Sequence, residues 1–257
     1  MGKKSLMFDL GFSSNRLGKN CFSCGLYKEC NSPNISCFGE GKKKILLVGE
    51  CPGREEDKIG IPFVGPSGRL LEELLGDVGL SLDGDCYRTN ACRCFCSKTP
   101  SDDNIEFCRD FLLKDIEELS SSCIITLGST ALKSILGCGL WKEHISSLEP
   151  WVGQIIPIYR FNSWLVPLWH PSYILREGDS EKGLVLKKAF CFYLNLAKKY
   201  CKEPLPERID ISKCTKILGN DIELISRELG GIGKGDYVSV DIETDRVKPE
   251  SSDSWIV

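Results

Sequence analysis

Cysteine is the residue type that gives this chain its clearest capacity for chemistry. The chain has 15 cysteines among 257 residues, and Cys21 and Cys24 form a CxxC pair near its start. Thiolates bind both zinc and iron–sulfur clusters, and the residue type alone does not decide between them. The opening MGKKSLMFDLG has neither the long apolar region nor the cleavage site of a signal peptide, and no segment approaches the roughly 18 apolar residues of a membrane span. We therefore expect a cytoplasmic protein with reduced thiols, some of them metal-binding, rather than a disulfide scaffold.

A second segment combines carboxylates with glycines and prolines. It reads Gly49-Glu50-Cys51-Pro52-Gly53-Arg54-Glu55-Glu56-Asp57 and continues as Gly60-Ile61-Pro62-Phe63-Val64-Gly65. Glycines and prolines after a strand usually form a turn, and the GxxPG pattern taken alone indicates nothing more. A carboxylate in such a loop is a candidate for positioning or activating water. His170 is one of only two histidines, and taken alone it would be interpreted as a structural histidine at a strand end.

Short apolar segments precede these chemical groups. Residues 44–49, 123–128 and 164–169 have the composition of strands buried on both faces. Between them lie helical apolar stripes, at 70–78 with Ser67 as N-cap and at 105–119 after Ser101. Strands separated by helices imply a parallel sheet covered on both faces, and in such sheets ligands bind at the carboxyl ends of the strands. The chemistry is therefore expected in the loops that begin at Glu50, Asn90, Gly128 and His170.

The extended pattern GE-x-PG-x-EED-x-x-G-x-PFVG at 49–65 closely resembles the first motif of the family 4, iron–sulfur uracil-DNA glycosylases. Three later stretches match in the order that the family requires: Tyr87-Arg88-Thr89-Asn90, Thr126-Leu127-Gly128-Ser129 and His170-Pro171-Ser172-Tyr173-Ile174-Leu175-Arg176. The resemblance covers about residues 18–200. It implies a three-layer α/β/α fold around a central, mainly parallel four-stranded sheet. It also implies a DNA repair enzyme that cleaves the bond between uracil and deoxyribose.

The resemblance implies roles for individual residues. Asn90 would read the edge of the uracil, His170 would stabilise negative charge developing on uracil O2, and Glu50 would position or activate water. Phe63 would stack on a base flipped out of the DNA. The other expected substrate-binding residues are Cys51, Gly53, Glu56, Tyr173 and Arg176, of which the last two would lie beside the minor groove.

The family holds a [4Fe–4S] cluster with a CxxC pair and two later cysteines, and zinc is the alternative metal for such a thiol set. The expected ligands are Cys21, Cys24, Cys94 and Cys108. Cys94 lies four residues beyond Asn90, but Cys92 or Cys96 is the third ligand if the register slips. The remaining cysteines with an expected role are buried, inert thiols: Cys86, Cys123, Cys138, Cys191 and Cys201.

Cys51 departs from the family, which has glycine or alanine at this position. A thiol is bulkier than either and could crowd the base pocket or alter which base is accepted. A second hypothesis is therefore a glycosylase-like module that binds DNA without catalysis, as a lesion sensor or a processivity element of a replicative polymerase. The formal net charge of −3 weakens a DNA-binding interpretation without excluding it, because backbone binding depends on clustered Lys and Arg.

Residues 236–245 form an apolar strand pattern that carries the acidic motif DxE at Asp241 and Glu243. The stretch VSVDIETDRVKP resembles the opening of the 3′–5′ exonuclease domain of family A DNA polymerases, in which these two carboxylates would hold metal ions. The chain stops at Val257, before the other carboxylate motifs. This predicts an inactive exonuclease stub and a fragment of a longer polymerase, an arrangement typical of a bacteriophage.

The expected domain organisation follows from both resemblances. A glycosylase-like domain with the cluster occupies 1–202, a linker with a strand–helix lead-in occupies 203–235, and the start of an exonuclease domain occupies 236–257. The expected partners are uracil-containing DNA, single- or double-stranded, and the rest of the polymerase polypeptide. The expected location is the cytoplasm of a bacterial host.

Overall fold

The computed structural model describes residues 17–141 and 145–207. These residues belong to the first of two compact units, Met1–Glu207 and Arg208–Val257. The predicted exonuclease segment at 236–257 lies outside the described residues, as does the lead-in from 208 to 235. Within the described part of the chain, no helix is long and apolar enough to cross a membrane.

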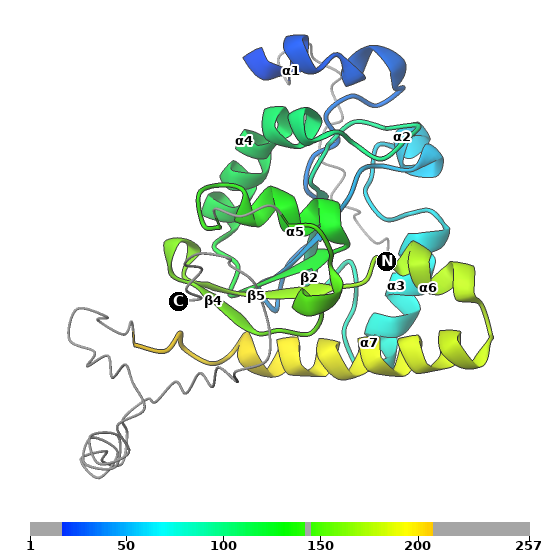
Figure 1. The fold of residues 1–257 in the computed structure, drawn as a ribbon, viewed down its shortest axis with the longest axis vertical. Helices are drawn as coiled ribbons and strands as arrows, with labels where there is room; N and C mark the ends of the chain where they lie inside the picture. The colour runs from blue at the N-terminus through cyan, green and yellow to red at the C-terminus, as the bar shows by residue number, and fades with distance from the viewer. Residues whose placement is uncertain (1–16, 142–144, 208–257) are drawn as a thin grey trace, which may run out of the picture. The chain divides into compact units, whose positions relative to one another are not determined.

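A five-stranded sheet forms the centre of the described fold (Figure 1). Four strands run parallel: β1 (Ile45–Gly49), β2 (Cys86–Asn90), β3 (Cys123–Leu127) and β5 (Ser163–Leu168). The short β4 (Ile156–Ile158) pairs antiparallel with β5, which gives the order β2-β1-β3-β5-β4. The predicted α/β fold with a mainly parallel sheet is confirmed, and β4 is an edge strand beyond the four expected. It has only 3 residues, too few to produce a periodic signal in the sequence.

Helices cover both faces of this sheet (Figure 1). Ile45 and Leu47 of β1 belong to a core cluster with α3 (Pro66–Asp77), α6 (Pro171–Glu177) and α7 (Glu181–Tyr200). Leu46 and Val48 belong to a second cluster with α4 (Asp102–Leu119) and α5 (Ser129–Leu136). Successive side chains of a strand point to opposite faces, so a strand buried by two helical layers must be apolar throughout. The three-layer arrangement is therefore the physical reason for the continuous apolar run in β1.

The described chain also has shorter helices. α1 spans Lys19–Cys24 and α2 spans Arg54–Ile59, and the 3-10 helices are η2 (Leu26–Glu29), η3 (Glu149–Trp151) and η4 (Tyr159–Phe161). The predicted N-cap Ser101 of α4 is confirmed, because its side chain accepts a hydrogen bond from the Asn104 N–H in a capping box. The predicted N-cap Ser67 of α3 is wrong. That helix begins one residue earlier at Pro66, behind Gly65, because proline suits the first helical position.

Candidate active site and metal centre

The carboxyl ends of β1 and β2 lie side by side, because Gly49 pairs with Asn90 in the parallel register. Gly49 leaves space that its neighbours use: a Cβ at this position would lie 2.4 Å from Asn90 Oδ1 and 2.6 Å from the Phe63 ring. Asn90 and Phe63 are both buried. The structure thus brings together the carboxamide and the aromatic ring that, by the family resemblance, are expected to bind the same base.

Phe63 has a backbone conformation that is unusual for a residue with a side chain, with φ at +55°. Three glycines and a carboxylate lie around this part of the chain. A Cβ on Gly68 would lie 1.9 Å from Phe63 O, and Gly65 donates its N–H to Glu56 Oε1 at 2.9 Å. A Cβ on Gly53 would lie 2.5 Å from Glu56 Oε2. The buried Glu56 carboxylate therefore holds the backbone at Gly65, two residues beyond Phe63, and packs closely against Gly53, a structural role beside its predicted one in substrate binding.

Glu50 follows β1 and is held by α5. The Thr130 hydroxyl donates a hydrogen bond to Glu50 Oε2 at 2.8 Å, across 80 residues of sequence. Thr130 is 3% exposed and lies in the first turn of α5, where the helix dipole favours a carboxylate. Glu50 thus has a fixed orientation at the same sheet edge as Asn90. Thr130 was not predicted from the sequence.

His170 follows β5 and caps α6. Its Nδ1 accepts the Ser172 backbone N–H at 3.2 Å and lies 2.8 Å from the Ser172 hydroxyl. Burial, with a smaller contribution from the Arg176 charge, lowers the pKa of His170 to about 4. The ring is neutral at pH 7, and because Nδ1 accepts a hydrogen bond, the proton resides on Nε2. A Cβ on Gly128 would lie 3.3 Å from the His170 Cβ, so the ends of β3 and β5 also meet.

Cys51 lies in the loop after β1, next to the cysteine-rich loop after β2. The two loops continue the pairing of β1 with β2, since Ala91 N–H donates to Gly49 O at 2.8 Å and Cys92 N–H donates to Glu50 O at 2.9 Å. The Cys51 thiol hydrogen-bonds the Cys96 thiol, and this contact is the largest cause that raises the pKa of Cys96. The side chain that departs from the family pattern therefore has a partner in the second loop.

One cavity is lined by four thiols, those of Cys21, Cys24, Cys94 and Cys108. Cys92 and Cys96 do not line it. Three of the four sulfurs accept N–H donors: Cys94 from Asn34 N at 3.3 Å, Cys108 from Arg93 N at 3.3 Å, and Cys24 from Asn104 Nδ2 at 3.4 Å. Such donors favour a thiolate, the form that binds metal. The residues present therefore fit a thiolate-bound iron–sulfur cluster.

Burial favours the protonated thiol at three of the four cysteines that line the cavity, because it raises the pKa of Cys21, Cys94 and Cys108. Burial raises the pKa of Cys94, and it raises that of Cys108 to about 11 although the Arg93 N–H and charge act in the opposite direction. Metal binding must therefore displace protons. Among the residues that the structure describes, no three or more His, Cys, Asp or Glu side chains form a group placed to hold a metal ion, although the four thiols line one cavity.

Asp57 connects α2, which follows the loop after β1, to residues 31–32. Its role was not predicted from the sequence. It is 3% exposed on α2 and accepts Asn31 N–H at 2.9 Å, Asn31 Nδ2 at 2.7 Å and Ser32 N–H at 3.0 Å. Asn34, two residues beyond Ser32, donates to the Cys94 thiol. The candidate active site and the cysteine cavity therefore share one hydrogen-bonded frame.

The predicted DNA-contacting residues lie around α6. The Tyr173 ring has two cations over it, Arg176 at 5.9 Å and Lys182 at 5.2 Å from the ring centroid. Leu175 on the same helix is 41% exposed. This arrangement combines an exposed apolar side chain with positive charge directly after His170.

The cysteines predicted to be inert divide into two groups. Cys86 and Cys123 are fully buried in strands, as expected. Cys138, Cys191 and Cys201 are only partly buried. All five lie outside the cavity lined by the four thiols.

The sequence of the chain was compared with those of known proteins and protein families. The model of the uracil DNA glycosylase superfamily matches residues 37–225. The chain is 33% identical to a type-4 uracil-DNA glycosylase of Thermotoga maritima, over 72% of this chain and 91% of the relative. It is 32% identical to that of Pyrobaculum aerophilum, over 67% and 90%. It also matches a DNA polymerase of Bacillus phage SP01 at 30% identity, over 58% of this chain and 16% of the polymerase. The chain belongs to the uracil DNA glycosylase superfamily.

Proposed function

We propose that this protein hydrolyses the N-glycosidic bond of uracil in DNA. The observation that carries the proposal is the convergence of the Asn90 carboxamide and the Phe63 ring at Gly49, with Glu50 and His170 on the same edge of the sheet. The type-4 uracil-DNA glycosylases among its relatives support the same activity. A uracil in a duplex must be flipped out to reach such a site, at an unstacking cost of a few kcal/mol.

Recognition of the base rests on Phe63 and Asn90. Phe63 stacks on the flipped ring, while the Asn90 carboxamide offers one acceptor and a pair of donors to the Watson–Crick edge. Uracil presents a donor at N3 and an acceptor at O4, whereas cytosine presents the opposite pattern. A rigid carboxamide that satisfies uracil leaves cytosine unpaired, and buried unpaired polar groups are costly. Burial of Asn90 beside β1 supports this rigidity.

Bond cleavage rests on His170 and Glu50. The neutral His170 ring carries its proton on Nε2, which donates to uracil O2 as negative charge develops there. A neutral donor does not have to lose a charge on entering a water-poor site, so burial does not oppose this role. Glu50, oriented by the Thr130 hydroxyl, positions the water that attacks the deoxyribose.

We further propose that Cys21, Cys24, Cys94 and Cys108 hold a [4Fe–4S] cluster rather than zinc. The cavity that these thiols line, and the N–H donors to three of the sulfurs, support this ligand set. These four residues come from α1, the loop after β2 and α4, so a cluster held by them would link these three segments. Tyr173, Leu175 and Arg176 then contact the DNA beside the flipped base, where an apolar side chain fills the gap in the stack.

We also propose that this glycosylase domain operates as part of a DNA polymerase. The match to the polymerase of Bacillus phage SP01 supports this link, as does the exonuclease-like sequence around Asp241 and Glu243. The partners are then uracil-containing DNA and the polymerase polypeptide.

Two single substitutions test catalysis against mere binding. Asn90→Ala and His170→Ala should abolish uracil release from a U·G duplex while the visible absorbance of the iron–thiolate groups and the affinity for DNA persist. A wild-type protein that binds the duplex with strong salt dependence, yet leaves every base intact, would instead support the non-catalytic module.

A further inference from the structure

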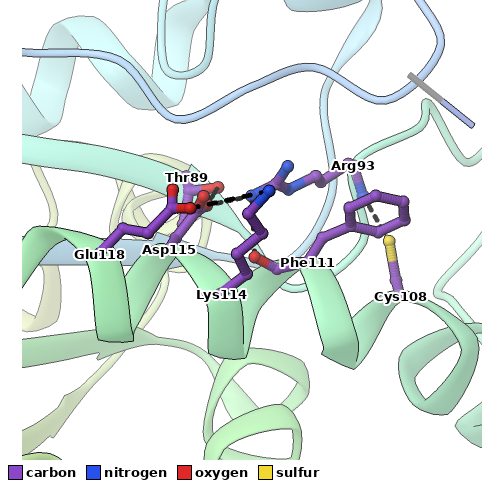
Figure 2. A network of polar contacts seen from close by, with 7 residues as sticks. All are labelled: Thr89, Arg93, Cys108, Phe111, Lys114, Asp115 and Glu118. Carbon is purple, nitrogen blue, oxygen red and sulfur yellow. Dashed lines mark hydrogen bonds and ion pairs between the residues drawn. The ribbon is translucent and has the colours of Figure 1, made fainter. Parts of the chain in front are cut away.

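Arg93 is a buried cation at the cysteine cavity that the proposed reaction does not use. It is 7% exposed, and it lines the cavity together with the four thiols. Its backbone N–H donates to Cys108 Sγ at 3.3 Å, and its guanidinium lies 5.2 Å from the Phe111 ring centroid. Figure 2 shows the side chain running from this sulfur toward Asp115 on α4.

The contacts of the guanidinium are incomplete. It forms an ion pair with Asp115 and donates to Phe111 O at 3.0 Å, but Nε is buried without a hydrogen-bond partner among the described residues. A buried ion pair contributes little to stability, because desolvation of the two charges offsets their attraction. The ion pair alone therefore does not explain why an arginine is buried at this position. A negatively charged group in the adjacent cavity would explain it, because the guanidinium would stabilise that charge.

We infer that Arg93 is a positioning residue that stabilises the negatively charged thiolate-bound cluster and joins it to the strand that carries Asn90. The inference rests on the proposed cluster. Net charge and hydrogen bonds to the sulfurs set the stability and potential of iron–sulfur groups, and Arg93 supplies both, the charge from its side chain and the hydrogen bond from its backbone.

The connection to the strand runs through Asp115. Its carboxylate pairs with Arg93 and accepts a hydrogen bond from the Thr89 hydroxyl at 3.4 Å (Figure 2). Thr89 directly precedes Asn90 in β2. Because Asp115 contacts both, a change in the charge around Arg93 acts on the residue next to the base-reading carboxamide.

Arg88 provides a matched control within the same strand region. It is 4% exposed, pairs with Asp83, lies 4.8 Å from the Phe38 ring centroid and also has a buried Nε without a hydrogen-bond partner in the described chain. It does not line the cysteine cavity. Arg93→Met and Arg88→Met therefore each remove a buried, ion-paired cation, although Asp83 is more exposed than Asp115, and only Arg93 adjoins the thiols.

The experiment measures iron retention and reduction potential, not activity. In iron-loaded protein under anaerobic conditions, Arg93→Met should release iron to a chelator about ten to a hundred times faster than wild type, the usual effect of losing a residue that supports metal ligands. Arg88→Met should release it at the wild-type rate. Arg93→Lys should lie between, because it keeps the charge and loses the planar contacts.

The direction in which each substitution shifts the reduction potential separates an electrostatic role of Arg93 from a merely structural one. A nearby cation favours the reduced cluster, so Arg93→Met should lower the reduction potential, whereas Asp115→Asn should raise it. Shifts of the same sign, or iron release from Arg93→Met at the rate of Arg88→Met, would overturn the inference. If Arg93→Met fails to fold, Asp115→Asn decides: a raised reduction potential is expected, and an unchanged or lowered one would overturn the inference. Wild-type protein without iron would overturn the cluster itself, and uracil release, assayed separately, tests the proposed reaction.

Discussion

The Thr130 hydroxyl fixes the orientation of Glu50 by donating a hydrogen bond to its carboxylate. Thr130→Val removes the hydroxyl and nearly keeps the shape. A hydrogen bond to a charged group contributes about 1.5–3 kcal/mol, so kcat for uracil release should fall about tenfold or more while KM stays nearly unchanged. Thr130→Ser keeps the donor and should restore most of the rate. Equal rates for the Val and Ser variants would show that the hydroxyl does not position Glu50.

His170 gives a pH-dependent expectation with a definite sign. Its pKa falls from 6.5 to about 4 in the folded protein, mainly through burial. The unfolded chain therefore binds a proton before the folded one does, and the ring weakens the fold as the pH drops from 6.5 to 4. We expect the NMR signals of the His170 ring, identified by their loss in His170→Asn, to titrate near pH 4. Titration near 6.5 would mean a solvated ring and remove the neutral donor from the mechanism.

The third cluster ligand can be decided by cysteine substitutions. Cys94 lines the cavity and Cys92 and Cys96 do not, so Cys94→Ser should lose most bound iron. Cys92→Ser and Cys96→Ser should bind iron in the wild-type amount. Iron measured per protein after anaerobic reconstitution checks this, and loss of iron in the Cys92 or Cys96 variant alone would transfer the ligand role to that residue.

Individual residues differ in how far the sequence could reveal them. Phe63, Asn90 and His170 each lie within a recognisable motif, and Asn90 and His170 lie at or just after the ends of strands, so these residues could be proposed from the sequence. Thr130, Arg93 and Asp57 act through contacts with partners 80, 22 and 26 positions away. No local pattern marks such a threonine, arginine or aspartate, because each is an ordinary polar residue until the fold supplies its partner.

At the scale of elements, α2 connects the loop after β1 to residues 31–32, through hydrogen bonds to Asp57. Asp57→Ala would leave the buried Ser32 N–H and the partly buried Asn31 N–H without their acceptor, which should lower the free energy of unfolding by about 2–4 kcal/mol. Amide exchange at Asn31 and Ser32 should rise with it. Glu55→Ala, on the same helix but exposed, removes only a surface pair with Arg69 and should change stability by less than about 1 kcal/mol. Equal effects of the two variants would contradict this role of Asp57.

The elements themselves followed local rules to different degrees. β1 and β3 could be predicted because strands covered on both faces must be apolar at every position. The start of α4 was readable from Ser101, whereas that of α3 was set by Pro66. β4 was missed because its short segment is defined only by pairing with β5, a long-range contact.

At the scale of the whole described unit, the candidate active site and the cysteine cavity are connected in three ways. Backbone pairing joins residues 49–50 to 91–92, Asp57 joins α2 to residues 31–32, and Arg93 with Asp115 joins the cavity to Thr89. The frame around the cysteine cavity is therefore continuous with the segments that carry Glu50, Phe63 and Asn90. The sequence predicted both sites but not their connection, which exists only in the folded chain.

Glycosylase activity is the central claim and has a direct measurement. Iron-loaded wild-type protein is incubated with a uracil-containing single strand and with a U·G duplex, and the released base is identified by mass spectrometry beside matched cytosine substrates. Free uracil with an abasic site in the DNA, and no free cytosine, is the expected result. Failure to release uracil with protein in excess over DNA would contradict the account.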